Sequence, residues 1–406
     1  MIAAEVDPIE SPSGIYLDAS ATSPPRLEVI ERMRQVQSTA WGNPSSLHQQ
    51  GLIAAEVMER SRHSIARTLQ ADRDELVFTS GATESIHLAL LGMARARPLG
   101  RLVISAVEHP AVNAAAEHFV AQGWDVVRWP VDRFGRVKMN LMEELLSPPT
   151  EIVSLIWGQS EIGTLQPIHA IGTVCRKMGI IFHTDATQVL SQGPIDWCNL
   201  PVDMLSASAH KFQGPRGIGL LLLRHHLFDL IHPLQGGGGQ ERGLRAGTEA
   251  VALIAGMAEA LSLLATDSEL DATFKNPSIT NIKAIKRQRD DLRSSLESIQ
   301  GIHITGDPID RLPHHLSMLV GTANDLPLSG RRVVRELSRL GVSASSGSAC
   351  HSGQSSDSEV LKAIGVAPKW RQSGLRFSLG PWLNSDQLAV VPDCLQRSLE
   401  AAASSG

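Results

Sequence analysis

The sequence has few cysteines, and they are widely spaced. Its four cysteines, Cys175, Cys198, Cys350 and Cys394, form no CxxC pair. This spacing argues against a disulfide framework or a zinc site, and it favours a reducing, cytoplasmic setting. We therefore predict no metal site.

The sequence also lacks a surplus of positive charge and a long hydrophobic run. Lys and Arg number 37 against 42 Asp and Glu, for a net charge of -5. This balance gives no basic surface for nucleic acid and no basic tract for a membrane surface. No stretch approaches the roughly 18 apolar residues of a membrane span. The acidic N-terminus does not resemble a signal peptide. We expect a cytoplasmic protein that binds neither membranes nor nucleic acids.

What is present is a large α/β pattern. The chain has 406 residues, of which 42% are hydrophobic, enough for a large core and two domains. Short apolar segments alternate with helical stretches of ten or more residues. Strands are expected at 76–80, 101–106, 125–129, 152–157, 180–183 and 218–223. This alternation predicts a mostly parallel sheet with helices on both faces.

The ends of the chain differ from this pattern. Residues 15–25 are typical of a short strand and a turn, a helix is expected at 26–37, and Ser46 is a candidate cap for the next helix. A polar stretch around 266–280 follows a long expected helix, and a helix at 281–299 precedes short strands and further helices. We predict a large domain over residues 26–265, and a smaller α+β domain formed by residues 1–25 and 266–406.

The main chemical signal is Lys211. A strand pattern from Asp203 ends just before His210 and Lys211, and glycine and proline then prevent any regular continuation. A lone lysine in such a turn is most often an ordinary surface residue. Here, however, Asp185 ends another apolar run upstream. A lysine for a Schiff base and an aspartate for a pyridinium nitrogen are the pair that a pyridoxal phosphate (PLP) enzyme needs.

Three other motifs have both a structural and a functional interpretation. Residues 81–85 form either a capped tight turn or a phosphate cup at a helix N-terminus. His109 either caps the helix that follows Pro110 or acts in a site. Arg376 either pairs with a surface acid or clamps the carboxylate of an amino acid. Each motif alone leaves these alternatives open. Five polar residues, Ser80, His109, Ser160, Asp185 and His210, follow strand signals, so we expect them at one edge of the sheet.

Taken together and in this order, the motifs resemble the cysteine desulfurases of the PLP-dependent class V aminotransferase superfamily. The resemblance spans about residues 15 to 400. Its most specific segment, Ser345 to Cys350, resembles the nucleophile loop of the nitrogen-fixation and housekeeping iron–sulfur desulfurases. The matching segments are 16–22, 42–46, 78–85, 108–112, 161–164, 183–188, 208–211, 243–248, 345–350 and 376–380. The resemblance implies a PLP fold-type I enzyme whose small domain carries the nucleophile loop.

The resemblance also implies how PLP is held. Lys211 would bind PLP covalently and move the α-proton of the substrate. Asp185 would keep the pyridine nitrogen protonated, His109 would stack on the ring and help to move protons, and Gln188 would contact the phenolic oxygen. The residues implied for the phosphate are Ala82, Thr83, Ser208 and His210, with Thr248 from the neighbouring subunit of a homodimer.

Thr248 follows the glycine run 236–239. A plain flexible linker is the alternative interpretation of that run, but the charged residues Glu241, Arg242 and Arg245 follow it instead of serine.

For the reaction, the resemblance implies that Arg376 binds the carboxylate of L-cysteine and that Cys350 takes its sulfur as a persulfide, leaving L-alanine. The sulfur would pass to an acceptor protein, such as an iron–sulfur scaffold or a thiolation partner. The alternatives are a PLP lyase or transaminase acting on another amino acid, and a weakly active scaffold for sulfur-transfer partners. The physiological acceptor, and the choice between cysteine and selenocysteine, stay open.

One departure from the family affects the site. The family usually has two consecutive asparagines where this chain has Gln159 and Ser160. The second asparagine contacts cofactor and substrate. Ser160 must therefore make these contacts with a shorter hydroxyl, or Gln159 must lean into the site. Among the cysteines, Cys175 fits an inert buried thiol better than Cys350 does.

Overall fold

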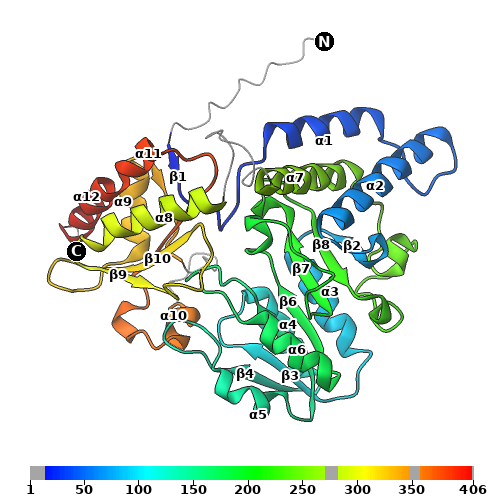
Figure 1. The fold of residues 1–406 in the computed structure, drawn as a ribbon, viewed down its shortest axis with the longest axis horizontal. Coiled ribbons are helices and arrows are strands. Elements are labelled where there is room, and N and C mark those ends of the chain that lie inside the picture. The colour runs from blue at the N-terminus through cyan, green and yellow to red at the C-terminus, as the bar shows by residue number, and fades with distance from the viewer. Residues whose placement is uncertain (1–13, 270–281, 348–356, 405–406) are drawn as a thin grey trace.

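The computed structural model describes residues 14–269, 282–347 and 357–404. The described chain forms two lobes (Figure 1). The larger lobe is built on a sheet of seven strands in the order β2-β8-β7-β6-β5-β3-β4. The strands are β2 (Leu76–Thr79), β3 (Arg101–Ser105), β4 (Asp125–Trp129), β5 (Thr150–Ile156), β6 (Ile181–Asp185), β7 (Met204–Ser208) and β8 (Gly219–Leu223).

Only β8 runs against its neighbours in this sheet. It pairs antiparallel with both β2 and β7, and the other strand pairs are parallel. The predicted α/β fold with a mostly parallel sheet is therefore confirmed. Because β2 and β7 flank the same antiparallel strand, they run in the same direction, and their carboxyl ends lie at one edge of the sheet.

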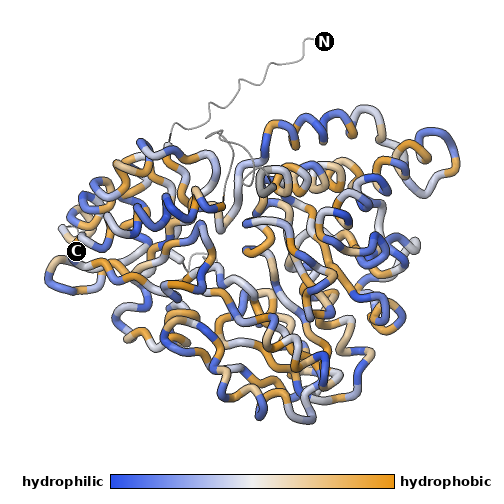
Figure 2. Tube along the Cα trace, viewed as in Figure 1, coloured by the Kyte–Doolittle hydropathy of each residue, from blue (hydrophilic) through white to orange (hydrophobic). Residues whose placement is uncertain are grey.

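Alternate residues of the strands enter two different cores. In β8, Leu220 and Leu222 belong to one buried cluster, whereas Leu221 and Leu223 belong to the other. The first cluster includes side chains of α6 (Ile168–Met178), and the second includes side chains of α3 (Ala82–Ala94) and α4 (Pro110–Ala121). Successive side chains of a strand point to opposite faces, so a continuous apolar run is what a sheet covered on both faces requires. Figure 2 shows hydrophobic stretches of the chain, in orange, along the central strands of the larger lobe.

Three helices pack together beside the sheet. These are α1 (Leu27–Thr39), α2 (Gln49–Thr68) and α7 (Val251–Glu269). The expectation that Ser46 caps α2 is wrong. Ser46 donates its backbone N–H to Asn43 O in a turn, and the cap is His48, whose Nδ1 accepts from Gly51 N at 3.3 Å. A short α5 (Met142–Leu146) precedes β5.

The smaller lobe has its own sheet and core. Its antiparallel sheet has the order β12-β10-β9, and its core combines Leu17 with residues between Ile285 and Ala402. A two-stranded parallel pair joins β1 (Ile15–Tyr16) to β11 (Val342–Ser343). The other elements are β9 (Ile302–Thr305), β10 (His315–Val320), β12 (Gly374–Ser378), α8 (Ile282–Glu297), α9 (Gly330–Arg339), α10 (Glu359–Ala363), α11 (Ser385–Ala389) and α12 (Val391–Ser404).

The two lobes share packing. Val360, Leu361 and Trp370 belong to the buried cluster of the larger lobe although they lie in the C-terminal part of the chain. The N-terminal residues, in contrast, lie in the smaller lobe through β1. The predicted domain boundaries stay a prediction. Across the residues that the structure describes, no helix is both long and apolar enough to cross a membrane.

Candidate active site

The carboxyl ends of the parallel strands carry the polar residues that the sequence singled out. Ser80 follows β2, His109 follows β3 and Ser160 follows β5. Asp185 is the last residue of β6, and His210 lies in the 3-10 turn (Ala209–Lys211) after β7. All these strands run in one direction, so the five residues lie at one edge of the sheet. The structure thus brings the predicted positions together.

Lys211 directs its amine at the N-terminal segment of the chain. Its Nζ donates to Ser20 O and Ala21 O, both at 2.7 Å. Burial, and then the positive charge of Arg376, lower the pKa of Lys211 to about 8. Lys211 also lines a cavity with Ala19 and His314. An amine with this lowered pKa is partly uncharged near neutral pH, which is the form that attacks a carbonyl group.

Asp185 is a buried carboxylate on the strand next to the lysine-bearing turn. It is 4% exposed, pairs across the sheet with Ser206 and accepts from Thr187 N at 3.0 Å. Its negative charge opposes the lowering of the pKa of Lys211, so the two groups lie within electrostatic reach. This carboxylate suits a partner for a protonated ring nitrogen.

His109 is the N-cap of α4, as its structural interpretation predicted. Its Nδ1 accepts from Ala111 N at 3.1 Å, which fixes the orientation of the ring and leaves the proton of the neutral ring on Nε2. Burial lowers the pKa of His109, the charge of Asp185 opposes this, and Lys211 adds to the lowering. The cap does not conflict with a role in the site, and that role stays a prediction.

The start of α3 is an open helix end beside β7. Gly81 supplies no side-chain cap, so the N–H groups of the first turn, including those of Ala82 and Thr83, are available to an anion. A Cβ atom at position 81 would lie 3.7 Å from Ser208 Oγ, so the two elements border one small space. His210 Nδ1 lies 3.1 Å from Thr22 Oγ1. Burial, then Lys211 and Arg216, lower the pKa of His210 to about 4.

These groups fit PLP. An amine for its aldehyde, a buried carboxylate for its pyridine nitrogen and an open helix N-terminus for its phosphate lie at one edge of the sheet. Gln188 is buried in the same region, and its Nε2 donates to Ser20 O at 2.9 Å. Thr248 is exposed in this chain. In the described ranges there is no group of three or more His, Cys, Asp or Glu that could hold a metal ion.

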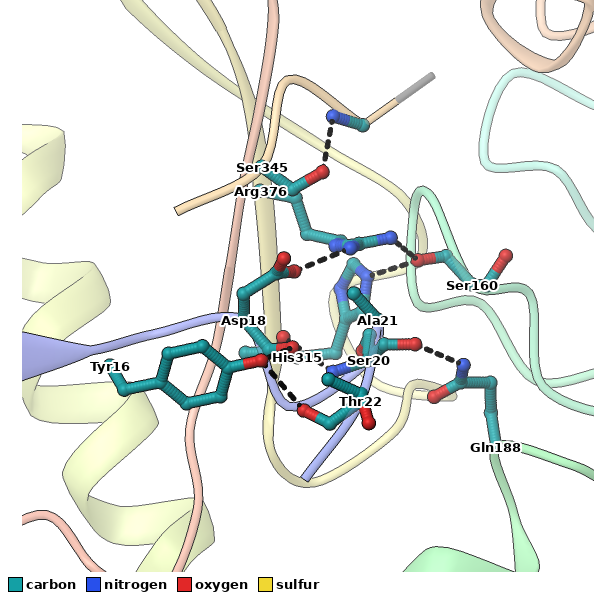
Figure 3. Close-up of polar contacts among 12 residues, drawn as sticks. Tyr16, Asp18, Ser20, Ala21, Thr22, Ser160, Gln188, His315, Ser345 and Arg376 are labelled. Carbon is teal, nitrogen blue, oxygen red and sulfur yellow. Dashed lines mark hydrogen bonds and ion pairs between the residues drawn. The ribbon is translucent and has the colours of Figure 1, made fainter. Parts of the chain in front are cut away.

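Arg376 lies on β12 and is 6% exposed. Its NH2 pairs with Asp18 Oδ1 at 2.7 Å, its NH1 donates to Ser160 O at 2.9 Å, and its buried Nε has no partner (Figure 3). The structural interpretation is thus partly right: Arg376 does pair with an acid, but within the site and not on the surface. Sequence reasoning missed Asp18, although it lies inside the matching segment 16–22.

Gln159 does not lean into the site, so that alternative is wrong. Its Oε1 accepts from Glu161 N at 2.5 Å and Ile162 N at 2.8 Å, and its Nε2 donates to Val107 O. Both the oxygen and the nitrogen of the amide are thus hydrogen-bonded to backbone groups of the protein. Figure 3 shows the carbonyl of Ser160 directed at Arg376 and its hydroxyl directed away. The proposed contact of Ser160 with the cofactor and the substrate stays a prediction.

Cys350 lies outside the described residues, but both flanks of its segment are anchored near Arg376. Ser345 exchanges two backbone hydrogen bonds with Arg376, at 2.7 and 3.2 Å. On the other side, Ser358 Oγ donates to Glu161 Oε1 at 2.5 Å. Cys175 is fully buried in α6, and burial followed by the charge of Asp203 raises its pKa to about 12, as expected of an inert thiol.

Comparisons with known proteins agree with this geometry. The family model described as aminotransferase class-V matches residues 15–391. Cysteine desulfurase IscS of Dictyoglomus turgidum is 35% identical over 95% of this chain and 94% of that protein. Cysteine desulfurase NifS of Azotobacter vinelandii is 35% identical over 93% of this chain and 90% of that protein. A solved structure described as a NifS-like protein superposes with a TM-score of 0.84 at 31% identity, covering 96% of this chain and 99% of that one.

Proposed function

Because the chain belongs to the cysteine desulfurases of the aminotransferase class-V family, we propose that it converts L-cysteine to L-alanine and takes the sulfur on Cys350 as a persulfide. The observation that carries the proposal is the meeting of three features at one place. These are the amine of Lys211 with the carboxylate of Asp185, the guanidinium of Arg376, and the anchored flanks of the Cys350 segment.

Each residue at the proposed PLP site would hold the part of PLP that its chemistry suits. Lys211 would hold the aldehyde of PLP, Asp185 its pyridine nitrogen, and Ala82 with Thr83 its phosphate. The chemistry that PLP supplies when bound is an electron sink for the α-carbon of an amino acid. The amine of Lys211, with its lowered pKa, would then remove and return the α-proton of the substrate.

Arg376 and Cys350 act at the two ends of the substrate. The guanidinium binds the carboxylate and so orients the substrate. The thiolate of Cys350 attacks the sulfur, because thiolate is the reactive form of cysteine. A new S–S bond forms and the C–S bond breaks. Its electron pair passes to the carbon skeleton, which takes up a proton and leaves as alanine. The reaction balances without an external oxidant or reductant.

The decisive experiment measures sulfide and alanine together after incubation with L-cysteine and a thiol reductant. The wild-type chain should release both in equal amounts. Cys350→Ala should make almost no alanine but should still exchange the α-proton of L-cysteine with solvent, since it lacks only the sulfur acceptor. Cys198→Ala, which removes an exposed cysteine, is the matched control and should behave as the wild type. Alanine production by Cys350→Ala near the wild-type rate, or release of keto acid or ammonia, would favour a general PLP lyase.

The proposal includes a homodimer. Large apolar side chains are exposed on and between α1 and α2, among them Leu27 (79% exposed), Trp41 (67%) and Leu47 (91%). Exposed apolar side chains of this size suit a surface that another protein covers. A second copy of the chain placed there would allow the exposed Thr248 to reach the phosphate site of its neighbour.

The destination of the sulfur completes the proposal. The persulfide on Cys350 would pass to an acceptor protein, such as an iron–sulfur scaffold or a thiolation partner. Cys175, Cys198 and Cys394 are unpaired thiols, which fits a reducing compartment such as the cytoplasm.

A further inference from the structure

We propose that Asp18 is an internal competitor for Arg376: the carboxylate of the substrate must take the place of the Asp18 carboxylate on the guanidinium. This exchange would make Asp18 a determinant of affinity and of specificity for ligands that carry a carboxylate. The inference rests on the proposed function in one respect, namely that Arg376 binds the carboxylate of an amino acid.

Asp18 lies in a segment that joins the two lobes, residues 18–22, which we call the strap. In the strap, Ser20 bonds to the smaller lobe, its N–H donating to Ser378 Oγ at 2.8 Å and its Oγ lying 3.2 Å from His314 Nε2. On the other side, the strap holds Lys211 through two carbonyl groups and Gln188 through one. Figure 3 shows Asp18 directed from the strap toward Arg376. The strap thus touches Arg376, proposed to bind the substrate carboxylate, and Lys211, proposed to hold PLP.

The backbone of Asp18 is fixed, but its side chain is not enclosed. Its carbonyl oxygen accepts from Ala21 N at 3.0 Å and Thr22 N at 3.3 Å, and its backbone forms a bridge with Ser378. Its side chain nevertheless remains 21% exposed, whereas that of Arg376 is 7% exposed. A rotation about the side-chain bonds therefore takes the Asp18 carboxylate toward water without moving the strap. The arginine stays in place, held by Ser160 O.

The charges favour exchange over simultaneous binding. A substrate carboxylate that joined Asp18 on Arg376 would place two negative charges next to each other in a largely buried place, which raises the free energy of the complex. Arg376 also has a buried Nε without a partner. A carboxylate that bridges Nε and NH2 would satisfy that nitrogen and form the two parallel hydrogen bonds of a bidentate pair. Asp18 makes only one such bond, at 2.7 Å.

The exchange affects only ligands that carry a carboxylate. An amine such as cysteamine offers nothing to replace Asp18, so Arg376 keeps its internal partner and the affinity of such a ligand does not depend on Asp18. L-cysteine loses part of its affinity to the displacement of Asp18, so Asp18 narrows the advantage of L-cysteine over simple thiol amines. Specificity of this kind is a difference between two affinities, and the internal carboxylate changes only one of them.

The test compares Asp18→Asn with the wild type in the full chain loaded with PLP. The probe is 3-mercaptopropionate, which has the thiol and carboxylate of cysteine but no amine to react with a carbonyl group. Calorimetry should show a Kd roughly three- to tenfold lower for Asp18→Asn, because the amide is a weaker competitor for the guanidinium. The KM for L-cysteine should fall in parallel. Asp125→Asn, which breaks an exposed Arg–Asp pair with Arg101 at the opposite edge of the sheet, should leave both values unchanged.

Further variants keep the test decisive. Asp18→Ser also removes the charge and should tighten binding in the same direction if Asp18→Asn does not fold. Arg376→Lys should weaken binding of the probe. A Kd for Asp18→Asn equal to or above that of the wild type overturns the exchange, since Asp18 would then only orient the arginine, and so does an Arg376→Lys variant that binds the probe normally. The proposed function fails by a different result, namely that the wild type makes no alanine and sulfide from L-cysteine.

Discussion

At the scale of single residues, the most informative group is the amine of Lys211. Burial and the charge of Arg376 lower its pKa to about 8, from 10.5 for an ordinary lysine. Below pH 8 the amine is mostly protonated and unreactive, and above pH 8 it is mostly neutral. In the chain without PLP, acylation of Lys211 followed by peptide mapping should therefore show a midpoint near pH 8. A lysine with the ordinary pKa should react only at much higher pH.

The same measurement separates the two causes of the shift. Arg376→Met removes a positive charge and should move the labelling midpoint of Lys211 upward, toward that of a surface lysine. Burial alone would keep the midpoint below 10.5. A midpoint unchanged by Arg376→Met would show that the two cations do not interact.

Residues with a local signal could be predicted from the sequence, and residues with distant partners could not. Lys211 and Asp185 each follow an apolar strand, so their place at the edge of the sheet follows from the pattern. His109 was a predictable cap because Pro110 follows it. The partner of Arg376 is 358 residues away, at Asp18, and no periodicity connects the two. The hydrogen bonds of the Gln159 amide were equally hidden, since one of its partners, Val107 O, is 52 residues away.

At the scale of elements, the loop that carries Thr248 is anchored and does not behave as a plain linker. Glu241 is buried between Arg62, which it meets at 2.5 Å, and Phe78 N, from which it accepts at 2.8 Å. The residue two positions after the glycine run, Glu241, is thus bound to the backbone of β2. Glu241 has a φ of 49° and lies in the left-handed region, so contacts and not local preference determine the loop.

We expect Glu241→Gln to destabilise the protein by about 3 kcal/mol, because it removes the buried counter-charge of the Arg62 guanidinium and leaves only the half-exposed Glu59 as an acidic partner. Urea unfolding measures the loss. Glu56→Gln, which breaks an exposed pair with Arg60, should cost no more than about 1 kcal/mol. Adding Arg62→Met to Glu241→Gln should recover part of the stability. Equal losses for Glu241→Gln and Glu56→Gln would contradict the anchoring role.

The positions of the strands could be predicted from local sequence rules, but the cap of α2 and the direction of β8 could not. The predicted strands match the observed ones to within a few residues, since buried strands read as uninterrupted apolar runs. Ser46 has the better capping propensity, yet α2 begins only at Gln49 and its N-cap is His48. The reversed direction of β8 has no local signature and follows from the short connection after Lys211.

At the scale of the whole molecule, shared active sites give the clearest test of the proposed dimer. Lys211→Ala and Thr248→Ala subunits should each have little activity alone. Mixed under conditions of subunit exchange, they should regain up to about a quarter of wild-type activity, because half of the dimers are hybrids by random pairing and one site of each hybrid keeps both residues. Mixing Lys211→Ala with Asp185→Ala is the matched control and should restore nothing if both residues serve the site of their own chain. Proven exchange without recovery in the first mixture would exclude the borrowed Thr248.

The strap also determines when the site can be completed during synthesis. The ribosome delivers Asp18 long before β11, with which β1 pairs near residue 342, and Arg376 emerges later still. The seven strands of the larger sheet end at Leu223, so they can pair while the strap still lacks its partners in the smaller lobe, Ser378 and Arg376. Contacts of such high contact order form late. A nascent chain stalled before residue 342 should therefore protect the large sheet from proteolysis while its N-terminal segment is still open to cleavage.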